Sequence, residues 1–132
     1  MSAPDMARSA PVLQVRDVVK AAAFYRDRLG FETASFWGEP PCFCIVGRGT
    51  VTLFLDQQRE AGPAPVNQYW AAYVYVDDVE AYAAELRERG VEILRGPEDM
   101  EHGCREFDVR DPDGHIVAFG QDLQPSEAGP GL

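Results

Sequence analysis

The first candidates for a chemical role in this chain are its two histidines. His102 closes an acidic stretch that starts at Glu98, and His115 directly follows the turn glycine Gly114. Imidazole and carboxylate groups are common ligands of divalent metals, so the acidic stretch could hold an adventitious ion. An exposed acidic loop is the interpretation that its composition favours, and the glycine predicts a surface or turn-capping position for His115.

Acid–base chemistry is a second possibility, and Tyr73, Tyr75 and Glu106 are the side chains that could transfer protons. Tyr73 and Tyr75 are two residues apart, so they lie on one face of any strand that they share. No nucleophile with an adjacent general base is visible, and the sequence therefore predicts no catalytic residues.

The cysteines Cys42, Cys44 and Cys104 form an odd set, and no signal-peptide pattern precedes them. That combination predicts reduced thiols and a cytoplasmic protein. Cys42 and Cys44 alternate with bulkier apolar residues, which is typical of small side chains on one face of a strand.

The formal net charge is -10 over 132 residues. Such a charge disfavours nucleic acid and anionic membranes and favours cationic partners, although it also simply promotes solubility. No apolar stretch approaches the roughly 18 residues of a membrane span. No glycine-rich turn with a following lysine predicts a nucleotide site either.

The chain contains an internal repeat, with one copy starting at Leu13 and the other at Val74. Seven identities follow in the same order, with a one-residue gap before the last two. The pairs are Val15 and Val76, Asp17 and Asp78, Val18 and Val79, Arg26 and Arg87, Arg28 and Arg89, Gly30 and Gly90, and Glu32 and Glu92.

Each copy begins with an alternating apolar strand and continues with apolar residues at helical spacing. Asp17 and Asp78 stand where a helix N-cap belongs, because their side-chain oxygens can accept hydrogen bonds from the first free N–H groups. Gly30 and Gly90 fit the left-handed position that ends a helix.

A hairpin follows in each copy. The first runs from Cys42 to Leu55 around the turn 47–49, and the second runs from Arg105 to Phe119 around the turn 111–114. A linker rich in proline covers residues 62–67. The sequence predicts an α+β fold of two tandem βαβββ modules, about 10–60 and 68–123, that form a cupped mixed sheet with the helices on the outer face. The tails 1–9 and 124–132 are expected to be flexible.

Two runs make the pattern specific to a family: FYRDRLGF from Phe24 to Phe31, and VRDPDGHIVAFGQ from Val109 to Gln121. Together with the paired βαβββ repeat, they resemble the vicinal-oxygen-chelate superfamily, the group of glyoxalase I, extradiol dioxygenases and bleomycin-resistance proteins. The resemblance covers about residues 10–121. It is nearest to the metal-free bleomycin-resistance proteins, which are acidic homodimers that sequester a cationic aromatic drug at the dimer interface.

Catalytic members of this superfamily hold a divalent metal with four side chains. Counting along the family motifs places those positions at Ala10, Phe54, Ala71 and Ala118. The repeat pairs Ala10 with Ala71 and, at a slightly longer offset, Phe54 with Ala118. None of the four carries a donor atom, so the resemblance implies a protein without metal or other cofactor.

The same positions define the side chains that look into the cup, because residues two apart share a strand face. This lining is apolar and aromatic and suits a planar small molecule. Its members are Ala10, Val12, Gln14, Thr52, Phe54, Ala71, Tyr73, Tyr75, Ile116, Ala118 and Gly120.

Other candidates have two interpretations each. Phe36 and Trp37, in the variable stretch before the hairpin, could stack on a ligand or lie in the core or a dimer interface. Trp70 is expected to point away from Ala71 and into the core or an interface. Arg105 could face a ligand or pair with Glu106. The expected ligand-binding residues are Gln14, Trp37, Thr52, Phe54, Tyr73, Tyr75, Arg105 and Ile116.

Three hypotheses follow from these observations. The leading one is a metal-free, dimeric protein that binds or sequesters a drug-like aromatic or cationic small molecule. The alternative is an enzyme of the superfamily, lyase-like or dioxygenase-like, with non-standard catalytic residues. The third is an interaction module in which dimerisation is the function and the cavity is vestigial.

Overall fold

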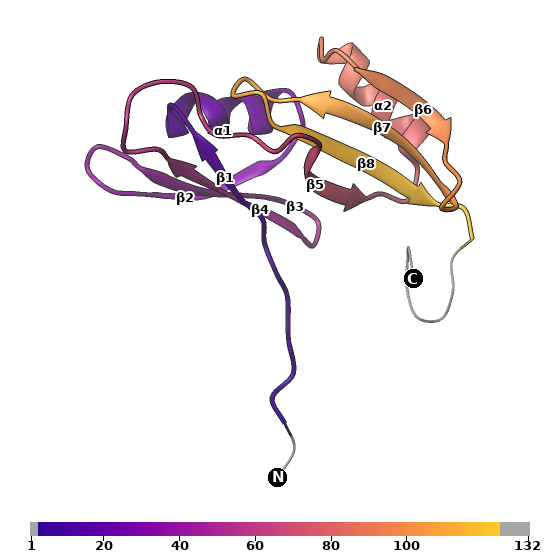
Figure 1. Cartoon of the computed structure of the whole chain (residues 1–132), viewed down its shortest axis with the longest axis horizontal. Coiled ribbons are helices and arrows are strands. Elements are labelled where there is room, and N and C mark those ends of the chain that lie inside the picture. Colours follow the sequence, from indigo (N-terminus) through magenta and orange to yellow (C-terminus); the bar gives the residue numbers. More distant parts are fainter. Residues whose placement is uncertain (1–2, 125–132) are drawn as a thin grey trace.

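The computed structural model describes residues 3–124. Apart from Gln124, the predicted C-terminal tail lies outside the described residues, and residues 3–9 form an exposed arm that leaves the body (Figure 1). The elements follow in the order β1 (Val12–Val15), α1 (Val18–Asp27), β2 (Glu32–Trp37), β3 (Phe43–Arg48), β4 (Val51–Gln57), β5 (Trp70–Tyr75), α2 (Val79–Glu88), β6 (Arg95–Asp99), β7 (Cys104–Arg110) and β8 (Ile116–Asp122).

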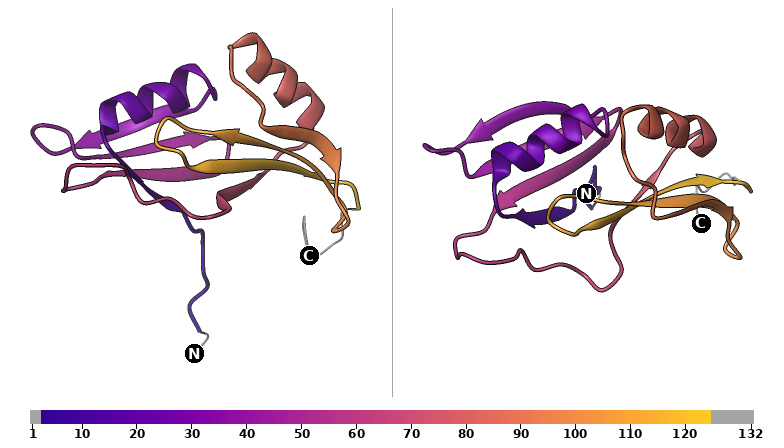
Figure 2. Two further views of the ribbon diagram at one scale, coloured as in Figure 1. Left: turned by 45° about the horizontal axis from the view of Figure 1, so that its top comes forward. Right: turned by 90° about the horizontal axis from the view of Figure 1, so that it is seen from above.

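The strands form two mixed sheets of the same topology, which confirms the predicted α+β fold of two βαβββ modules. Their orders are β1-β4-β3-β2 and β5-β8-β7-β6. Within each sheet the first and last strands of the module are parallel neighbours, and the other pairs are antiparallel. The expected single cupped sheet is thus two four-stranded sheets, each covered on one face by its own helix (Figure 2).

Both helices start in the same way. As predicted, Asp17 and Asp78 accept hydrogen bonds from N–H groups of the first turn. A second cap comes from the last strand of each module: the side-chain oxygen of Gln57 accepts from the first N–H of α1 at 2.9 Å, and that of Gln121 accepts from the first N–H of α2 at 3.1 Å. The repeat therefore preserves a complete capping arrangement, not only the aspartates.

The helix ends meet each other. Gly30 and Gly90 have φ values of +76° and +79°, the left-handed conformation predicted for them. A guanidinium N–H of Arg28 donates to the backbone carbonyl of Arg89, and Arg89 donates at 3.3 Å to the backbone carbonyl of Asp27. Each helix thus supplies a cation to the negative C-terminal end of the other.

One apolar core lies between the sheets and the helices and extends through both modules. Its largest fully buried side chains include Tyr25, Phe107 and Phe119. The ring of Tyr82 on α2 packs edge-on against Phe119 with centroids 4.9 Å apart. No helix within residues 3–124 is long and apolar enough to cross a membrane.

The β7–β8 turn binds the first module through hydrogen bonds. Its Asp111 accepts a hydrogen bond from the Tyr25 hydroxyl at 2.9 Å, and both groups are buried. Its Asp113 accepts from the backbone N–H and the guanidinium of Arg16. In the opposite direction, Arg48, the last residue of β3, forms a bidentate ion pair with Glu85 on α2, at 2.7 and 3.0 Å.

His115 contributes to the same junction, which corrects the surface position expected for it. Its side chain is buried at 4% exposure, and Nε2 lies 2.7 Å from the backbone carbonyl of Gln14 in β1. That partner is 101 residues away, so local sequence could not reveal it.

Candidate functional site

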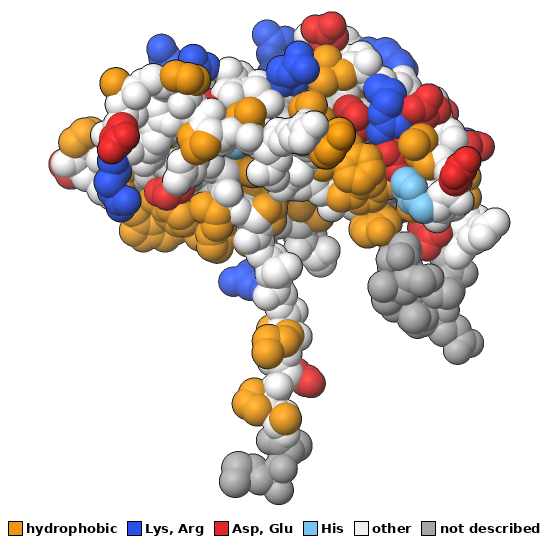
Figure 3. All heavy atoms as spheres, in the orientation of Figure 1, with side chains coloured by type: hydrophobic (Ala, Val, Ile, Leu, Met, Phe, Trp, Pro, Cys, Tyr) orange, Lys and Arg blue, Asp and Glu red, His pale blue; other side chains and the backbone are white. Residues whose placement is uncertain are grey.

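Within residues 3–124, each sheet has one face that no helix covers. These faces are here called the first open face and the second open face. On the first, aromatic side chains from three strands meet. The ring of Phe43 lies 5.6 Å from that of Trp37 and 5.4 Å from that of Phe54. Val12 and Trp37 are 57% and 47% exposed. Apolar side chains gather along this side of the molecule in Figure 3, and the first open face is therefore a largely unpaired apolar surface.

The second open face carries a row of three aromatic rings along β5. The rings of Trp70 and Tyr73 lie 5.0 Å apart, and those of Tyr73 and Tyr75 lie 5.1 Å apart. Trp70 and Tyr75 remain 39% and 44% exposed, so flat surface is available to a ligand. Such rings provide large contact areas and stacking with little loss of conformational entropy.

Trp70 is in this row because β5 is irregular, and the expectation that it points away from the open face is wrong. The pairing of β5 with β8 shifts register between Trp70 and Ala72. The shift interrupts the alternation of side chains. The indole therefore contacts Tyr73, and its Nε1–H donates to Asp108 at 3.1 Å.

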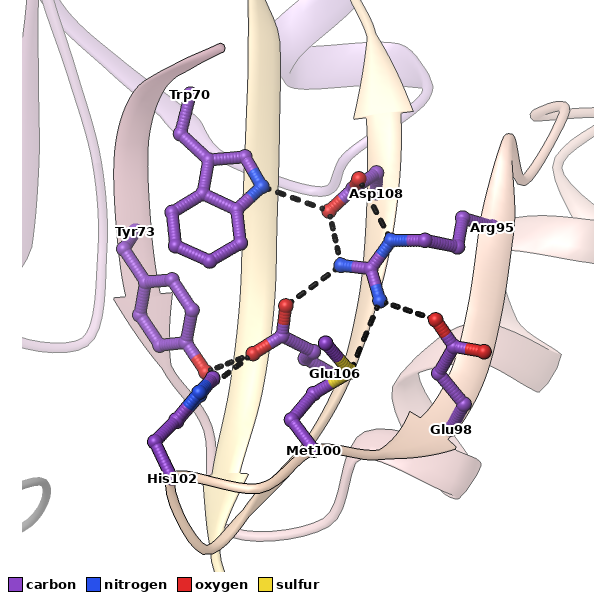
Figure 4. A network of polar contacts seen from close by, with 8 residues as sticks. All are labelled: Trp70, Tyr73, Arg95, Glu98, Met100, His102, Glu106 and Asp108. Carbon is purple, nitrogen blue, oxygen red and sulfur yellow. Dashed lines mark hydrogen bonds and ion pairs between the residues drawn. The ribbon is translucent and has the colours of Figure 1, made fainter.

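Beside the aromatic row, Glu106 on β7 has no exposed surface and is fully paired (Figure 4). The Tyr73 hydroxyl donates to its Oε1 at 2.9 Å, and His102 Nε2 lies 2.9 Å from the same oxygen. A guanidinium nitrogen of Arg95 lies 2.6 Å from Oε2. Because a buried carboxylate is costly unless it is paired, these three partners are what allows Glu106 to be there.

Arg95 is the centre of the network. Its guanidinium binds both oxygens of Asp108 at 3.0 Å and one oxygen of Glu98 at 2.6 Å, and it contacts the sulfur of Met100 at 3.4 Å. Together with Glu106, three carboxylates surround one guanidinium. The network therefore keeps a local excess of negative charge next to the aromatic row.

A bulge in β6 places Arg95 and Glu98 on the same side, although residues three apart on a regular strand point to opposite faces. The pairing with β7 shifts between these two residues. Gly96 lies in the shift with a φ of +86°, and a Cβ there would meet the backbone oxygen of Glu106 at 2.3 Å. Only glycine fits there, and the network depends on it.

Tyr73 reaches Glu106 by crossing β8 above Gly120. A Cβ at Gly120 would lie 2.0 Å from the Tyr73 hydroxyl oxygen and 2.5 Å from the ring carbon that bears it. The absence of a side chain at Gly120 therefore leaves the space through which the Tyr73 phenol reaches Glu106.

Electrostatics fix the protonation of the two donors. Burial, followed by hydrogen bonds to Cys104 and Glu106, raises the pKa of Tyr73 well above its ordinary value of 10.0. The hydrogen bond to Asp108 is the largest cause that raises the pKa of Arg95, with further contributions from Glu98 and Glu106. Tyr73 is therefore a neutral hydrogen-bond donor and Arg95 a permanent cation at neutral pH.

A groove of about 660 Å³ runs between the start of β4 and strand β5, in the size range of small-molecule sites. Its walls come from both modules and from the base of the N-terminal arm. They are formed by Ser9, Ala10, Pro11, Thr50, Val51, Thr52, Leu53, Ala72, Tyr73, Val74 and Tyr75.

Of the predicted ligand-binding residues, Thr52, Tyr73 and Tyr75 come together in this groove. Trp37 and Phe54 lie on the first open face instead, each against Phe43. The structure thus divides the expected lining between a groove and an apolar surface.

The remaining predicted residues lie elsewhere. Ile116 is half-buried where β8 pairs with β5. Gln14 is exposed and borders a separate hollow beside the linker. Arg105 follows neither of its two interpretations: it pairs with Asp99 at 2.7 Å, on the face of β7 opposite to its neighbour Glu106.

The four positions at which catalytic relatives would bind a metal hold Ala10, Phe54, Ala71 and Ala118, and Ala118 is completely buried. Their side chains are hydrocarbon, so they do not fit a divalent metal, which needs oxygen, nitrogen or sulfur ligands. Within the described residues, no group of three or more His, Cys, Asp or Glu side chains could hold a metal ion.

Comparison with known proteins agrees with this architecture. A family model for the Glyoxalase/Bleomycin resistance protein/Dioxygenase superfamily matches residues 8–119. The chain belongs to this superfamily. Among curated proteins, none matches the chain.

Solved structures similar to this superfamily member include both binding proteins and an enzyme. A bleomycin-binding protein in complex with bleomycin has a TM-score of 0.73 at 25% identity, covering 88% of this chain and 98% of that one. TnmS3, an antibiotic binding protein from Streptomyces sp. CB03234, has a TM-score of 0.68 at 27% identity, covering 89% and 99%. A lactoylglutathione lyase from Agrobacterium tumefaciens has a TM-score of 0.70 at 22% identity, covering 92% and 97%, and shows the fold alone.

Proposed function

We propose that this protein binds and sequesters a small aromatic or cationic molecule without a metal. The observation that carries the proposal is the row of Trp70, Tyr73 and Tyr75, which borders a ligand-sized groove and a network rich in carboxylates. Aromatic rings stack on a planar ligand, and the negative charge favours a cationic one.

The relatives support the same proposal. The bleomycin-binding protein and TnmS3 are both proteins that bind antibiotics. The hydrocarbon at Ala10, Phe54, Ala71 and Ala118 argues against the metal-assisted chemistry of catalytic relatives. The free thiols of Cys42, Cys44 and Cys104 fit a reducing compartment, and we place the protein in the cytoplasm.

We further propose that the protein works as a homodimer in which a second copy covers the first open face. Val12 and Trp37 are exposed on an apolar surface that a monomer would leave in water. Sedimentation should give the mass of two chains, and Trp37→Ser should shift it toward one. A single-chain mass for the unchanged protein at all concentrations would contradict the dimer.

Binding is tested with the two tryptophans, Trp37 and Trp70, as fluorescent reporters. A panel of planar aromatic compounds, cationic and neutral, should give saturable quenching. Tyr75→Ala should weaken binding about tenfold, the equivalent of one lost stacking contact. Val19→Ala, an exposed position on α1, is the matched control and should change nothing. An absence of saturable quenching across the panel would overturn the proposal.

One observation favours a second candidate, an enzyme that uses non-standard residues. The Tyr73 hydroxyl and the His102 imidazole both lie against Oε1 of the Glu106 carboxylate. A proton could move among these three groups. Mass spectrometry of compounds after incubation separates the candidates. An unchanged compound supports sequestration, and a changed one that depends on Glu106 supports the enzyme.

A further inference from the structure

Glu106 is a carboxylate without exposed surface, one hydrogen bond away from the lining of the groove. Arg95 holds its Oε2, whereas its Oε1 is shared by Tyr73 and His102 (Figure 4). Tyr73 is itself part of the groove wall. Oε1 therefore lies directly behind the surface that a bound molecule would touch.

His102 differs from the other two partners of Glu106 in how easily it can move. Tyr73 and Arg95 are on strands, but His102 lies in the tight turn between β6 and β7. Its side chain is 50% exposed, whereas that of Glu106 is 0% exposed. Its other contact is an edge-on approach to the ring of Tyr73 at 6.4 Å. Rotation of the imidazole into solvent would uncover Oε1 without disturbing either sheet.

His102 presents its ring nitrogen Nε2 to Oε1 at 2.9 Å. An ammonium or amidinium nitrogen on an aromatic ligand could take the place of Nε2 and donate to Oε1, and a charge-assisted hydrogen bond of this kind is about twice as strong as a neutral one. Three carboxylates around one guanidinium also leave negative charge unbalanced at this point. A cation therefore gains more than a neutral molecule by replacing the imidazole.

We propose that Glu106 recognises a cationic nitrogen of the ligand and that His102 occupies this position in the free protein. The inference rests on the proposed binding function and adds the residue that determines the preference for cations. His102 competes with the ligand, and Glu106 is the shared acceptor.

The test uses two probes of similar size, 9-aminoacridine, which is a cation at neutral pH, and acridone, which is neutral. Their affinities are measured by fluorescence for the unchanged protein and three variants. His102→Ala removes the competitor and should raise the affinity for 9-aminoacridine about tenfold, roughly the contribution of one hydrogen bond to a charged group. The affinity for acridone should stay within about twofold of that of the unchanged protein, because a neutral ring gains no charge-assisted hydrogen bond from the carboxylate.

Glu106→Gln should lower the affinity for 9-aminoacridine about tenfold and spare acridone. Glu101→Gln removes an exposed charge from the same turn without touching Glu106 and should have little effect on either probe. Because Glu106→Gln can unsettle the network around Arg95, the surface variant His102→Ala decides the question.

The outcomes separate the two proposals. Binding of both probes with the same affinity ratio in His102→Ala and in the unchanged protein would overturn this inference alone. Failure of the unchanged protein and of every variant to bind either probe would overturn the binding function and this inference with it. A ratio that moves toward the cation in His102→Ala and away from it in Glu106→Gln supports both.

Discussion

Tyr73 is held over Gly120 so closely that any side chain at that position must move it. We expect Gly120→Ala to push the phenol away from Glu106 and break their hydrogen bond. The free energy of unfolding should fall by about 1–3 kcal/mol, because the buried carboxylate loses a donor. Denaturant unfolding measures the loss.

The control for that substitution is the same change in a Tyr73→Ala background, where no ring is left to clash. There Gly120→Ala should lower the free energy of unfolding far less. Equal losses in the two backgrounds would mean that Gly120 matters for the strand itself and not for Tyr73.

At this scale, the sequence predicts only what regular alternation controls. Tyr73 and Tyr75 could be paired on one face because they are two apart. Trp70 and Arg95 could not be placed, because each lies at a register shift that interrupts the alternation. The glycine-proline step at Gly96 is the one sign of irregularity that the sequence of β6 carries.

The capping of both helices by glutamine is a feature of whole elements. Gln57 and Gln121 each bind the first N–H of the helix in their own module. Gln57→Ala and Gln121→Ala should each lower the free energy of unfolding by about 1 kcal/mol, the usual effect of a lost cap. Gln68→Ala, at an exposed position between β4 and β5, is the control and should have no measurable effect. If all three variants unfold alike, the glutamines do not cap.

The elements themselves were largely predictable, because the repeat gave each of them twice. The aspartates before both helices and the glycines after them are as expected. The glutamine caps were also in the sequence, 64 residues apart. Phe54 and Ala118 share this spacing, so the same offset that relates the two last strands could have revealed them. What alternation and repetition could not give is the division into two sheets.

For the molecule as a whole, the buried contact between Tyr25 and Asp111 joins the two modules and makes stability depend on pH. Burial raises the pKa of Asp111 above its ordinary value of 3.8, although its hydrogen bonds with His115, Tyr25 and Asp113 act in the opposite direction. A carboxyl group whose pKa is higher in the folded state binds its proton first on the folded chain. Its contribution to stability therefore improves as the pH falls through the folded-state pKa toward the unfolded value.

Comparison with Asp111→Asn isolates this effect, because the amide does not titrate. As the pH is lowered from neutral toward about 4, the free energy of unfolding of the unchanged protein should improve relative to that of the variant. Chemical denaturation at several pH values measures the difference. A constant difference across this range would show that Asp111 titrates alike in both states.

The hydrogen bonds and ion pairs between the two modules determine what happens when the chain is cut between them. Residues 58–69, between β4 and β5, contain no helix or strand, so cleavage there would sever no hydrogen-bonded ladder. In separated fragments, however, Tyr25 would lack Asp111, Arg48 would lack Glu85, and each helix end would lack the other's arginine. Two fragments divided at this linker should be unstructured when expressed separately and should reassemble when expressed together, which makes the chain a candidate for fragment complementation.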